Sequence, residues 1–458
     1  MRILVTNHHL HEYTGSEVST LTLCKFLSKK GHEVTVYSKY FSESFIKEFN
    51  KNNVRPINNL DLIKGENFDI GHIQQNIPAY EIRNSFPKLP LVMWIHGVIP
   101  YLERPPFIDL NISKFLVNNI EGKEFLVNKY NIASNKIFII RNIIDAEQFY
   151  STSTINKFPK KALIISNKIT PEKELLLKKV LDKLSIKYKF VGKRFGIIPH
   201  SELPLYINKA DIVFTVALGA METMMCGRIP ILFDYNYAPY DDGMVTKDNF
   251  ESLKEFNFSG RATKQIFDES KLYDEIKKYK QENGDELMLL AKKNYDANTK
   301  VDILIDIYNQ TIKDFRYKKI NDKNQKILFH INRIIQETNY YTKNNLYILS
   351  KTNQNIKEEI EKEKKSINEL LFTLNKIRSS KAFKFWQKSC NFKLKHSKKI
   401  KSLDIYKVPT SKLSYLKKYK NDLQTQLDQI KNSKFYKLWQ KYNDIKKIFM
   451  NKENISKL

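Results

Sequence analysis

The sequence is poor in cysteine and has no long apolar run. Only three cysteines occur in 458 residues, Cys24, Cys226 and Cys390, and their wide separation gives neither a paired zinc-ligand spacing nor a disulfide framework. No stretch reaches the roughly 18 to 20 apolar residues that a membrane-spanning helix needs. The opening MRILVTNHHL lacks the charged start and apolar segment of a signal peptide. We therefore expect a cytoplasmic protein, free or peripheral at the inner face of the cell membrane.

The net charge of +28 is distributed unevenly along the chain. Most of the excess lies beyond residue 320, where Lys, Asn and Gln dominate and Gly almost disappears. A protein built throughout to bind nucleic acid would not partition its charge in this way. Nucleic acid is therefore disfavoured as a partner.

Short apolar runs alternate with helical stripes up to about residue 316, which is the pattern of βαβ units and parallel sheets. The predicted strands are 2–6, 33–38, 68–72, 91–95, 136–140, 162–165, 188–191, 212–215 and 229–233, and the main predicted helices are 17–30, 172–184, 221–226 and 284–316. We therefore predict two Rossmann-like α/β domains, 1–155 and 156–318, with the last helix, about 298–316, packing back toward the first domain.

Residues 319–458 are predicted to form a Lys-rich helical tail with coiled-coil stripes. It contains a repeat, IRSSKAFKFWQK at 377–388 and IKNSKFYKLWQK at 430–441. Along 435–449, aromatic and apolar side chains share one helical face, beside a face of lysines. That arrangement suits an anionic membrane surface. Packing onto another helix, self-association and RNA binding remain open alternatives.

Ligands of parallel α/β sheets bind beyond the carboxyl ends of the strands, where helix N-termini present free N–H groups. Gly15 lies where the first such loop enters its helix and allows close approach of the backbone to a ligand, although it could also simply make a turn. The full Gly-x-Gly-x-x-Gly pattern is absent, which disfavours a nicotinamide or flavin enzyme.

Four segments resemble the retaining GT-B glycosyltransferases of family 4. They are the opening MRILVTNHHLHEYTGSEVSTLTLCKFLSKKGHEVTVYS, FIIRNIIDAEQF at 138–149, NKITPEKE at 167–174 and ADIVFTVALGAMETMMCGRIPIL at 210–232. The resemblance implies a GT-B fold, in which two Rossmann-like domains face each other across a cleft. It also implies transfer of a sugar, with retention, from a nucleotide diphosphate sugar to a glycan or lipid-linked acceptor in cell-surface polysaccharide synthesis. Neither a cofactor nor a metal is expected.

The same resemblance assigns catalytic roles to three residues. Lys168 and Lys173 match the Arg and Lys that bind the donor diphosphate in the family, and two cations there would stabilise the leaving group. His96, in WIHG, corresponds to a position near the reacting sugar and the acceptor. Solvated lysines and a structural histidine are the plainer alternatives.

Donor binding is assigned to the first loop and to the segment around Glu222. Glu222 matches the second Glu of the family's paired motif, which holds the nucleotide ribose. Helix-start amides would face the phosphates, and Arg261 could supply a further cation. The candidate substrate-binding residues are Gly15, Ser16, Gly219, Ala220, Met221, Glu222 and Arg261.

The sequence departs from the family pattern at the first Glu of that motif, where Phe214 stands. This departure leaves two alternatives open. One is a catalytically degenerate GT-B scaffold or binding module. The other is a GT-B sugar-nucleotide epimerase, which would need extra catalytic carboxylates in the cleft that the sequence does not provide. The adjacent Asp241 and Asp242 are interpreted as solvated rather than metal-binding.

Overall fold

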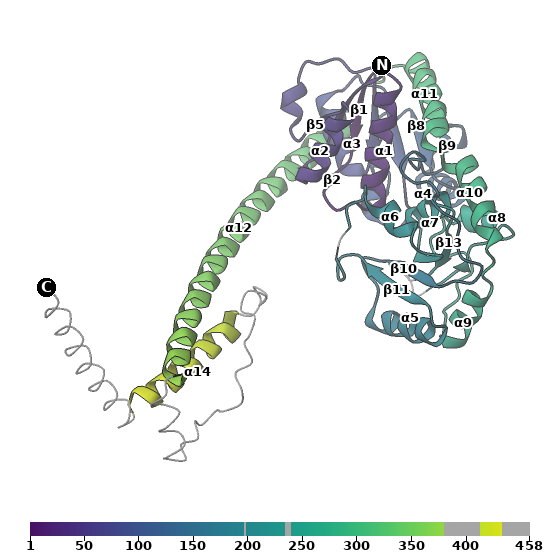
Figure 1. The fold of residues 1–458 in the computed structure, drawn as a ribbon. Coiled ribbons are helices and arrows are strands. Elements are labelled where there is room, and N and C mark those ends of the chain that lie inside the picture. The colour runs from purple at the N-terminus through teal and green to yellow at the C-terminus, as the bar shows by residue number, and fades with distance from the viewer. Residues whose placement is uncertain (197, 234–239, 380–412, 433–458) are drawn as a thin grey trace, which may run out of the picture. The chain divides into compact units, whose positions relative to one another are not determined.

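The computed structural model describes residues 1–196, 198–233, 240–379 and 413–432, and the chain divides into two compact units, 1–335 and 336–458 (Figure 1). The first unit contains two α/β domains. Each unit is described separately below.

The first domain is built on a seven-stranded parallel sheet with the order β5-β3-β1-β6-β7-β8-β9. Its central strands are almost completely buried, as expected for a parallel sheet covered on both faces. The strands are β1 (Arg2–Thr6), β3 (Glu33–Tyr37), β5 (Arg55–Ile57), β6 (Ile70–Gln74), β7 (Leu91–Ile95), β8 (Lys114–Val117) and β9 (Ile137–Ile139); β2 (His9–Leu10) and β4 (Tyr40–Phe41) form a separate small pair.

Helices cover both faces of this sheet. The carboxylate of Glu17 accepts a hydrogen bond from the N–H of Thr14 at 2.7 Å, which is the capping-box contact expected from their spacing. The helices are α1 (Gly15–Lys29), α2 (Glu43–Lys51), α3 (Asn76–Ser85) and α4 (Ile120–Tyr130), with short 3₁₀ turns η1 (Leu60–Ile63), η2 (Tyr101–Glu103) and η3 (Ser134–Lys136).

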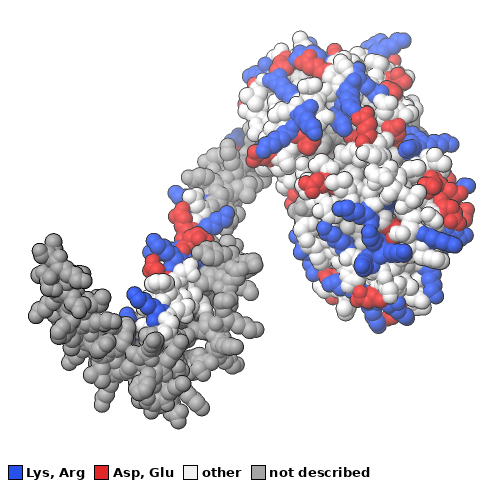
Figure 2. Space-filling view, in the orientation of Figure 1, with Lys and Arg blue, Asp and Glu red and all other residues white. Residues whose placement is uncertain are grey.

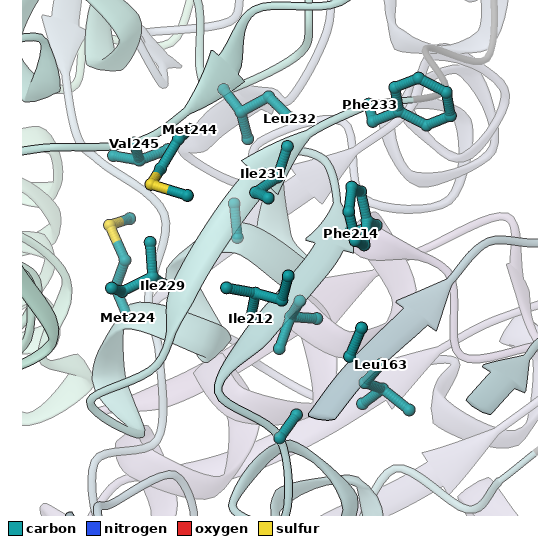
Figure 3. Close-up of a cluster of buried hydrophobic side chains, with 14 of the residues drawn as sticks. Leu163, Ile212, Phe214, Met224, Ile229, Ile231, Leu232, Phe233, Met244 and Val245 are labelled. Atoms are coloured by element: carbon teal, nitrogen blue, oxygen red, sulfur yellow. The ribbon is translucent and has the colours of Figure 1, made fainter. Parts of the chain in front are cut away.

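The second domain has a five-stranded sheet in the order β11-β10-β12-β13-β14, parallel except for β14. Figure 3 shows its apolar core, in which the rings of Phe214 and Phe233 lie 6.0 Å apart at 82°. Its elements are β10 (Lys161–Ile165), α5 (Pro171–Lys183), β11 (Lys187–Val191), α6 (Leu203–Ile207), β12 (Ile212–Thr215), α7 (Leu218–Met225), β13 (Ile229–Leu232), β14 (Gly243–Met244), α8 (Phe250–Glu255), α9 (Glu269–Lys277) and α10 (Glu282–Tyr295).

The chain crosses between the domains twice, and the crossings lie side by side. Ile144 donates from its N–H to the carbonyl of Tyr295 at 2.7 Å and accepts from the N–H of Ala297 at 2.9 Å. At Asp296 the predicted helix 284–316 divides into α10 and α11 (Ala297–Asp314). Helix α11 buries Val301, Leu304 and other apolar residues in the core of the first domain.

The first unit extends beyond the predicted domain limit at 318. Helix α12 spans Asp322–Ser379, and Leu328 in its second turn is buried in the first domain's core. Asn332 donates from its side chain to the carbonyl of Tyr80 at 3.3 Å. The composition changes near 319, but the apolar stripe of these first turns still packs on the domain, so the compact unit ends at Ile335.

The second unit pairs the later part of α12 with α14 (Leu413–Lys431). Lys417 contacts Glu359 at 2.6 Å and Lys420 contacts Glu363 at 3.1 Å, so the two helices run in the same direction (Figure 1). Ile360, Ile367, Leu374, Leu423 and Leu427 are buried. The tail is therefore helical as predicted where it is described. Most of the basic-aromatic repeats 377–388 and 430–441, and all of 435–449, lie outside the described residues.

Among the helices in the described ranges, none combines the length and apolarity needed to cross a membrane. On the first unit, Figure 2 shows positive and negative side chains interspersed over the visible face. This mixture agrees with the assignment of most excess positive charge to the chain beyond residue 320.

Candidate active site

The strand orders mark where a ligand would bind each sheet. The order reverses between β1 and β6 in the first domain and between β10 and β12 in the second. Ligands of open α/β sheets bind beyond the carboxyl ends of strands at such switch points. The loops there include residues 7–14 after β1, residues 166–170 after β10 and residues 216–217 after β12.

A cavity of about 190 Å³ lies between the two domains. The first domain contributes residues 95–100, after β7, and the start of α4; the second contributes 216–217 and 257–261. Typical pockets for small ligands have volumes of about 300–1,000 Å³. The domains therefore lie close together in this structure, with the loops that follow β7 and β12 facing each other.

His96 lies on the first-domain wall of this cavity. Its ring stacks on Trp94 with centroids 4.7 Å apart, and the amide of Asn118 donates to the His96 carbonyl at 3.2 Å. Burial lowers the pKa of His96 to about 4, opposed by a hydrogen bond with Asn142. The imidazole is therefore neutral at pH 7 and can donate or accept a hydrogen bond.

Glu103 is hydrogen-bonded to the backbone at His96. Its carboxylate accepts from the His96 N–H and from the Gln75 side chain, both at 3.3 Å. Gln75 in turn accepts from the N–H of His8 at 3.0 Å and has a positive φ of 70°. Burial raises the pKa of Glu103 to about 7, while these hydrogen bonds favour its charged form. A chain of polar contacts thus links the first loop to the cavity wall.

Arg261 lines the opposite wall and forms an ion pair across the cavity. Its guanidinium makes contacts of 2.7 and 2.8 Å with the two carboxylate oxygens of Glu121, at the start of α4. It also donates to the hydroxyl of Ser259 at 2.9 Å. The predicted donor cation is therefore already engaged by a carboxylate of the other domain.

Lys173 lies in the first turn of α5 and forms an ion pair with the fully buried Asp241. Its ammonium also lies 4.4 Å from the centre of the Phe233 ring. Phe214, which stands where the family has a Glu, is buried and packs against that same ring. The carboxylate beside Lys173 therefore comes from Asp241.

Asp241 and Asp242 are buried rather than solvated, contrary to the sequence interpretation. Asp241 accepts from the N–H of Phe267 at 3.0 Å, and Asp242 accepts from the N–H of Ala262 and Thr263 at 3.1 and 2.8 Å. These carboxylates accept hydrogen bonds from backbone N–H groups at residues 262–267, directly after Arg261, and Asp241 also pairs with Lys173 on α5. This organises the loop 257–267.

Glu222 is buried in α7 and makes a 2.7 Å hydrogen bond with Nε2 of His200. The His200 ring lies against Phe149 at 5.1 Å and, from the first domain, against Tyr13 at 6.2 Å. The position predicted to hold a ribose is thus occupied by an imidazole, and the loop before Gly15 covers it.

The start of α7 is shaped by Gly219, because a Cβ there would lie 2.3 Å from the hydroxyl of Thr215. The amides of Ala220 and Met221 donate to the carbonyl of Ala217 at 3.0 and 3.4 Å. Ala217 itself has a positive φ of 52° and lines the cavity. Within α7, therefore, the amides of Ala220 and Met221 bond to the helix's own first turn.

The remaining predicted residues lie in exposed loops and helix starts. Gly15 opens α1, and a Cβ added there would meet no atom within 4 Å, so packing does not require glycine. Ser16 follows it, and its carbonyl accepts from the hydroxyl of Thr20 at 2.8 Å. Lys168 is exposed in the loop after β10.

The predicted site residues do not form one cluster; they lie in separate groups. His96 and Arg261 share the cavity, while Glu222 bonds His200, whose ring stacks on Tyr13 in the loop before Gly15. Among the described residues that line the cavity, neither Lys168 nor Lys173 occurs. The sequence did not identify Glu121, His200 or Glu103. Their partners, which are Arg261, Glu222 and Gln75 respectively, lie far away along the chain, so no local pattern marks these pairs.

Residues 13–148 match the family model described as Glycosyltransferase Family 4. A glycosyltransferase from Rickettsia africae ESF-5 has a similar structure, with a TM-score of 0.52 and 15% identity, covering 69% of this chain and 99% of that one. Anabaena Alr3699/HepE, crystallised with UDP and glucose, gives a TM-score of 0.50 at 12% identity, covering 68% and 100%. No curated protein matches the sequence significantly.

The fold is GT-B, and residues 13–148 of the first domain match the family 4 model. This confirms the predicted GT-B fold and the family resemblance. The two domains of this GT-B chain are closed around the cavity by the Arg261–Glu121 pair and by a contact of 2.7 Å between Lys193 and Glu12.

Proposed function

We propose that this GT-B chain transfers a sugar from a nucleotide diphosphate sugar to a glycan or lipid-linked acceptor. The observation that carries the proposal is the cavity between the loops at the strand ends of the two sheets, which has His96 on one wall and Arg261 on the other. The family 4 match of the first domain supports the same reaction class.

In this proposal, donor binding exchanges internal ion pairs for contacts with the nucleotide. Lys168 and Lys173 bind the diphosphate and stabilise the charge that develops on the leaving group, so no metal is needed in the chemical step. Glu222 accepts hydrogen bonds from the ribose after His200 withdraws. His96, kept neutral by burial, contacts the reacting sugar or positions the acceptor hydroxyl. Closure of the domains excludes water and limits hydrolysis of the donor. Retention at the anomeric carbon is proposed from the family resemblance.

The acceptor is proposed to belong to cell-surface polysaccharide synthesis, at the cytoplasmic face of the membrane. The basic-aromatic repeats of the tail support this location through their sequence alone. Co-sedimentation of the full chain with vesicles containing anionic lipid tests the point. Recovery entirely in the supernatant at low salt would favour self-association or a helical partner for the tail.

A second candidate is a catalytically degenerate GT-B scaffold. It is favoured by Phe214 in place of the family's Glu and by the internal pairing of three predicted donor residues, Lys173, Glu222 and Arg261. In a scaffold these pairs can stay formed, whereas in an enzyme of the proposed kind they must separate each time a donor binds.

A thermal-shift screen of UDP-, GDP- and ADP-sugars against the full chain separates the two candidates. The enzyme proposal expects stabilisation by one nucleotide class, followed by sugar release from that donor, with turnover lost in Lys168→Ala. Lys168 is suitable because its own side chain is exposed. Absence of stabilisation by every donor would favour the scaffold.

A further inference from the structure

The loop after β1 places two imidazoles beside a buried carboxylate. Nδ1 of His11 lies 3.4 Å from Oε1 of Glu17, and Nε2 of His9 lies 4.0 Å from the same oxygen. The two imidazole rings are 5.2 Å apart at 72°. One nitrogen from each histidine and the carboxylate oxygen all lie within 4.8 Å of one another. We propose that His9, His11 and Glu17 form a binding site for a divalent transition metal ion, for which Zn²⁺ is the best match.

The local backbone explains why these side chains converge. Residues two apart on an extended chain project to the same side, which brings His9 and His11 together around Leu10 of β2. Glu17 lies in the first turn of α1 and turns back toward the same loop. The sequence HHLHEYTGSE thus folds into a tight turn around one carboxylate.

The Glu17 carboxylate is held in place by the backbone. It is fully buried and accepts from the N–H of His11 at 2.9 Å and of Thr14 at 2.7 Å, with longer contacts of 3.2 and 3.4 Å from the N–H of Glu12. Carboxylates that ligate metals are commonly fixed by such hydrogen bonds. Oε1 accepts one short hydrogen bond, from His11, and only a long contact of 3.4 Å from Glu12, so one of its two lone pairs is available to a metal ion.

The spacing fits metal coordination better than direct hydrogen bonding. Neither imidazole is as close to the carboxylate as a hydrogen bond of about 2.7–3.2 Å requires. A tetrahedral Zn²⁺ with bonds of about 2.0–2.1 Å separates its ligand atoms by about 3.4 Å, which is the His11–Glu17 distance. Nε2 of His9, 4.0 Å from the same oxygen, would have to come closer by about 0.6 Å to reach that separation.

The position of the site suggests what the ion would stabilise. His11 is exposed, which leaves a path to solvent and an open fourth position. In the same loop, Glu12 contacts Lys193 of the second domain at 2.7 Å, and Tyr13 packs on His200. A bound ion would hold residues 9–17 in one conformation. This segment includes Tyr13, which covers the His200–Glu222 pair. This role is separate from the proposed transfer chemistry.

Zn²⁺ titration of the chelator-treated full chain by calorimetry tests the site, with Co²⁺ absorption as a second readout of tetrahedral coordination. Wild type is expected to bind one Zn²⁺ at this site. His11→Asn should weaken binding at least tenfold, and His9→Asn combined with His11→Asn should abolish it. The matched control is His330→Asn, on the exposed face of α12, which should bind as wild type does.

Thermal unfolding without metal checks that the variants fold. The double variant should unfold at nearly the wild-type temperature in the presence of chelator, because neither imidazole makes a short hydrogen bond to Glu17. Added Zn²⁺ should raise the Tm of wild type and of His330→Asn only, since binding to the native state stabilises it. Unchanged Zn²⁺ affinity in the double variant, or no saturable binding by wild type, would overturn the proposal. Neither readout depends on glycosyl transfer.

Discussion

Arg261 and Glu121 form a two-contact ion pair that joins the domains across the cavity, with N–O distances of 2.7 and 2.8 Å. Both side chains are partly buried, so the pair is better protected from solvent than an ordinary surface ion pair. An anion that contacts this guanidinium must compete with Glu121 for it. We therefore expect binding of such an anion to weaken the link between the two domains.

Replacement of Glu121 by Gln should remove the competing carboxylate from Arg261 and tighten nucleoside diphosphate binding by about tenfold, equivalent to about 1.4 kcal/mol. Calorimetry with the nucleoside diphosphate that stabilises wild type most strongly measures the change. Arg261→Ala is the opposite control and should weaken binding of the same ligand. If neither variant changes the affinity, Arg261 does not contact the bound anion.

Lys173 has both a structural and a proposed chemical role, and a pair of variants separates them. Lys173→Met removes the ammonium that pairs with the buried Asp241 and should cost about 3 kcal/mol of unfolding free energy, measured by urea denaturation. Adding Asp241→Asn should recover most of that stability. If Lys173 binds the donor diphosphate, the double variant should remain inactive. Recovery of turnover in the double variant would limit Lys173 to a structural role.

Tyr308 on α11 shares a 2.6 Å hydrogen bond with Nδ1 of the fully buried His72 on β6. Tyr308→Phe leaves that nitrogen unpaired and should destabilise the first unit by about 2 kcal/mol in urea denaturation. Tyr279→Phe is the matched control. The hydroxyl of Tyr279 donates to an exposed carbonyl of Asn156, which water can satisfy, so its loss should cost less. Equal effects would show that α11 is not held by this bond.

The raised pKa of Glu103 predicts a pH-dependent stability. Its pKa moves from 4.5 to about 7, so the native state binds more protons than the unfolded state between these values. The stability of wild type relative to Glu103→Gln should therefore fall as pH rises from about 4.5 to 7, by about 3 kcal/mol at most. Urea denaturation of both proteins across this pH range measures the difference. A flat difference would contradict the burial of an ionisable Glu103.

His96 predicts the opposite sign, because burial lowers its pKa from 6.5 to about 4. In this interval the unfolded state binds more protons, so the stability of wild type relative to His96→Asn should rise as pH increases from about 4 to 6.5. The same denaturation series checks this result. The Glu103 carboxylate accepts a hydrogen bond from the N–H of His96, so the two residues can influence each other. The two stability differences must therefore be measured in separate single variants.

The sequence predicted the regular part of the fold well, because buried parallel strands are continuous apolar runs. Residues 2–6, 91–95 and 212–215 were located with their observed bounds. Strand β8 was not predicted. It begins with Lys114, whose ammonium lies 2.9 Å from the side-chain oxygen of Gln310 on α11, and only the folded chain supplies that partner.

The contacts of the candidate site were not predictable from the sequence. Motif positions indicated His96, Lys173 and Glu222, and a polar loop indicated Arg261. The groups that engage three of them, Asp241, His200 and Glu121, come from other elements, and Glu121 belongs to the other domain. Such pairing depends on how the sheets and loops meet in space, and no local spacing encodes it.

The placement of α11 and the first turns of α12 in the first domain has a consequence for the order of synthesis. A chain emerging from the ribosome exposes all seven strands of that domain long before the helices that complete its core. The second domain lies wholly between them and can fold first. We therefore expect nascent chains shorter than about 335 residues to retain an uncovered apolar face, which would leave them vulnerable to chaperone capture and proteolysis.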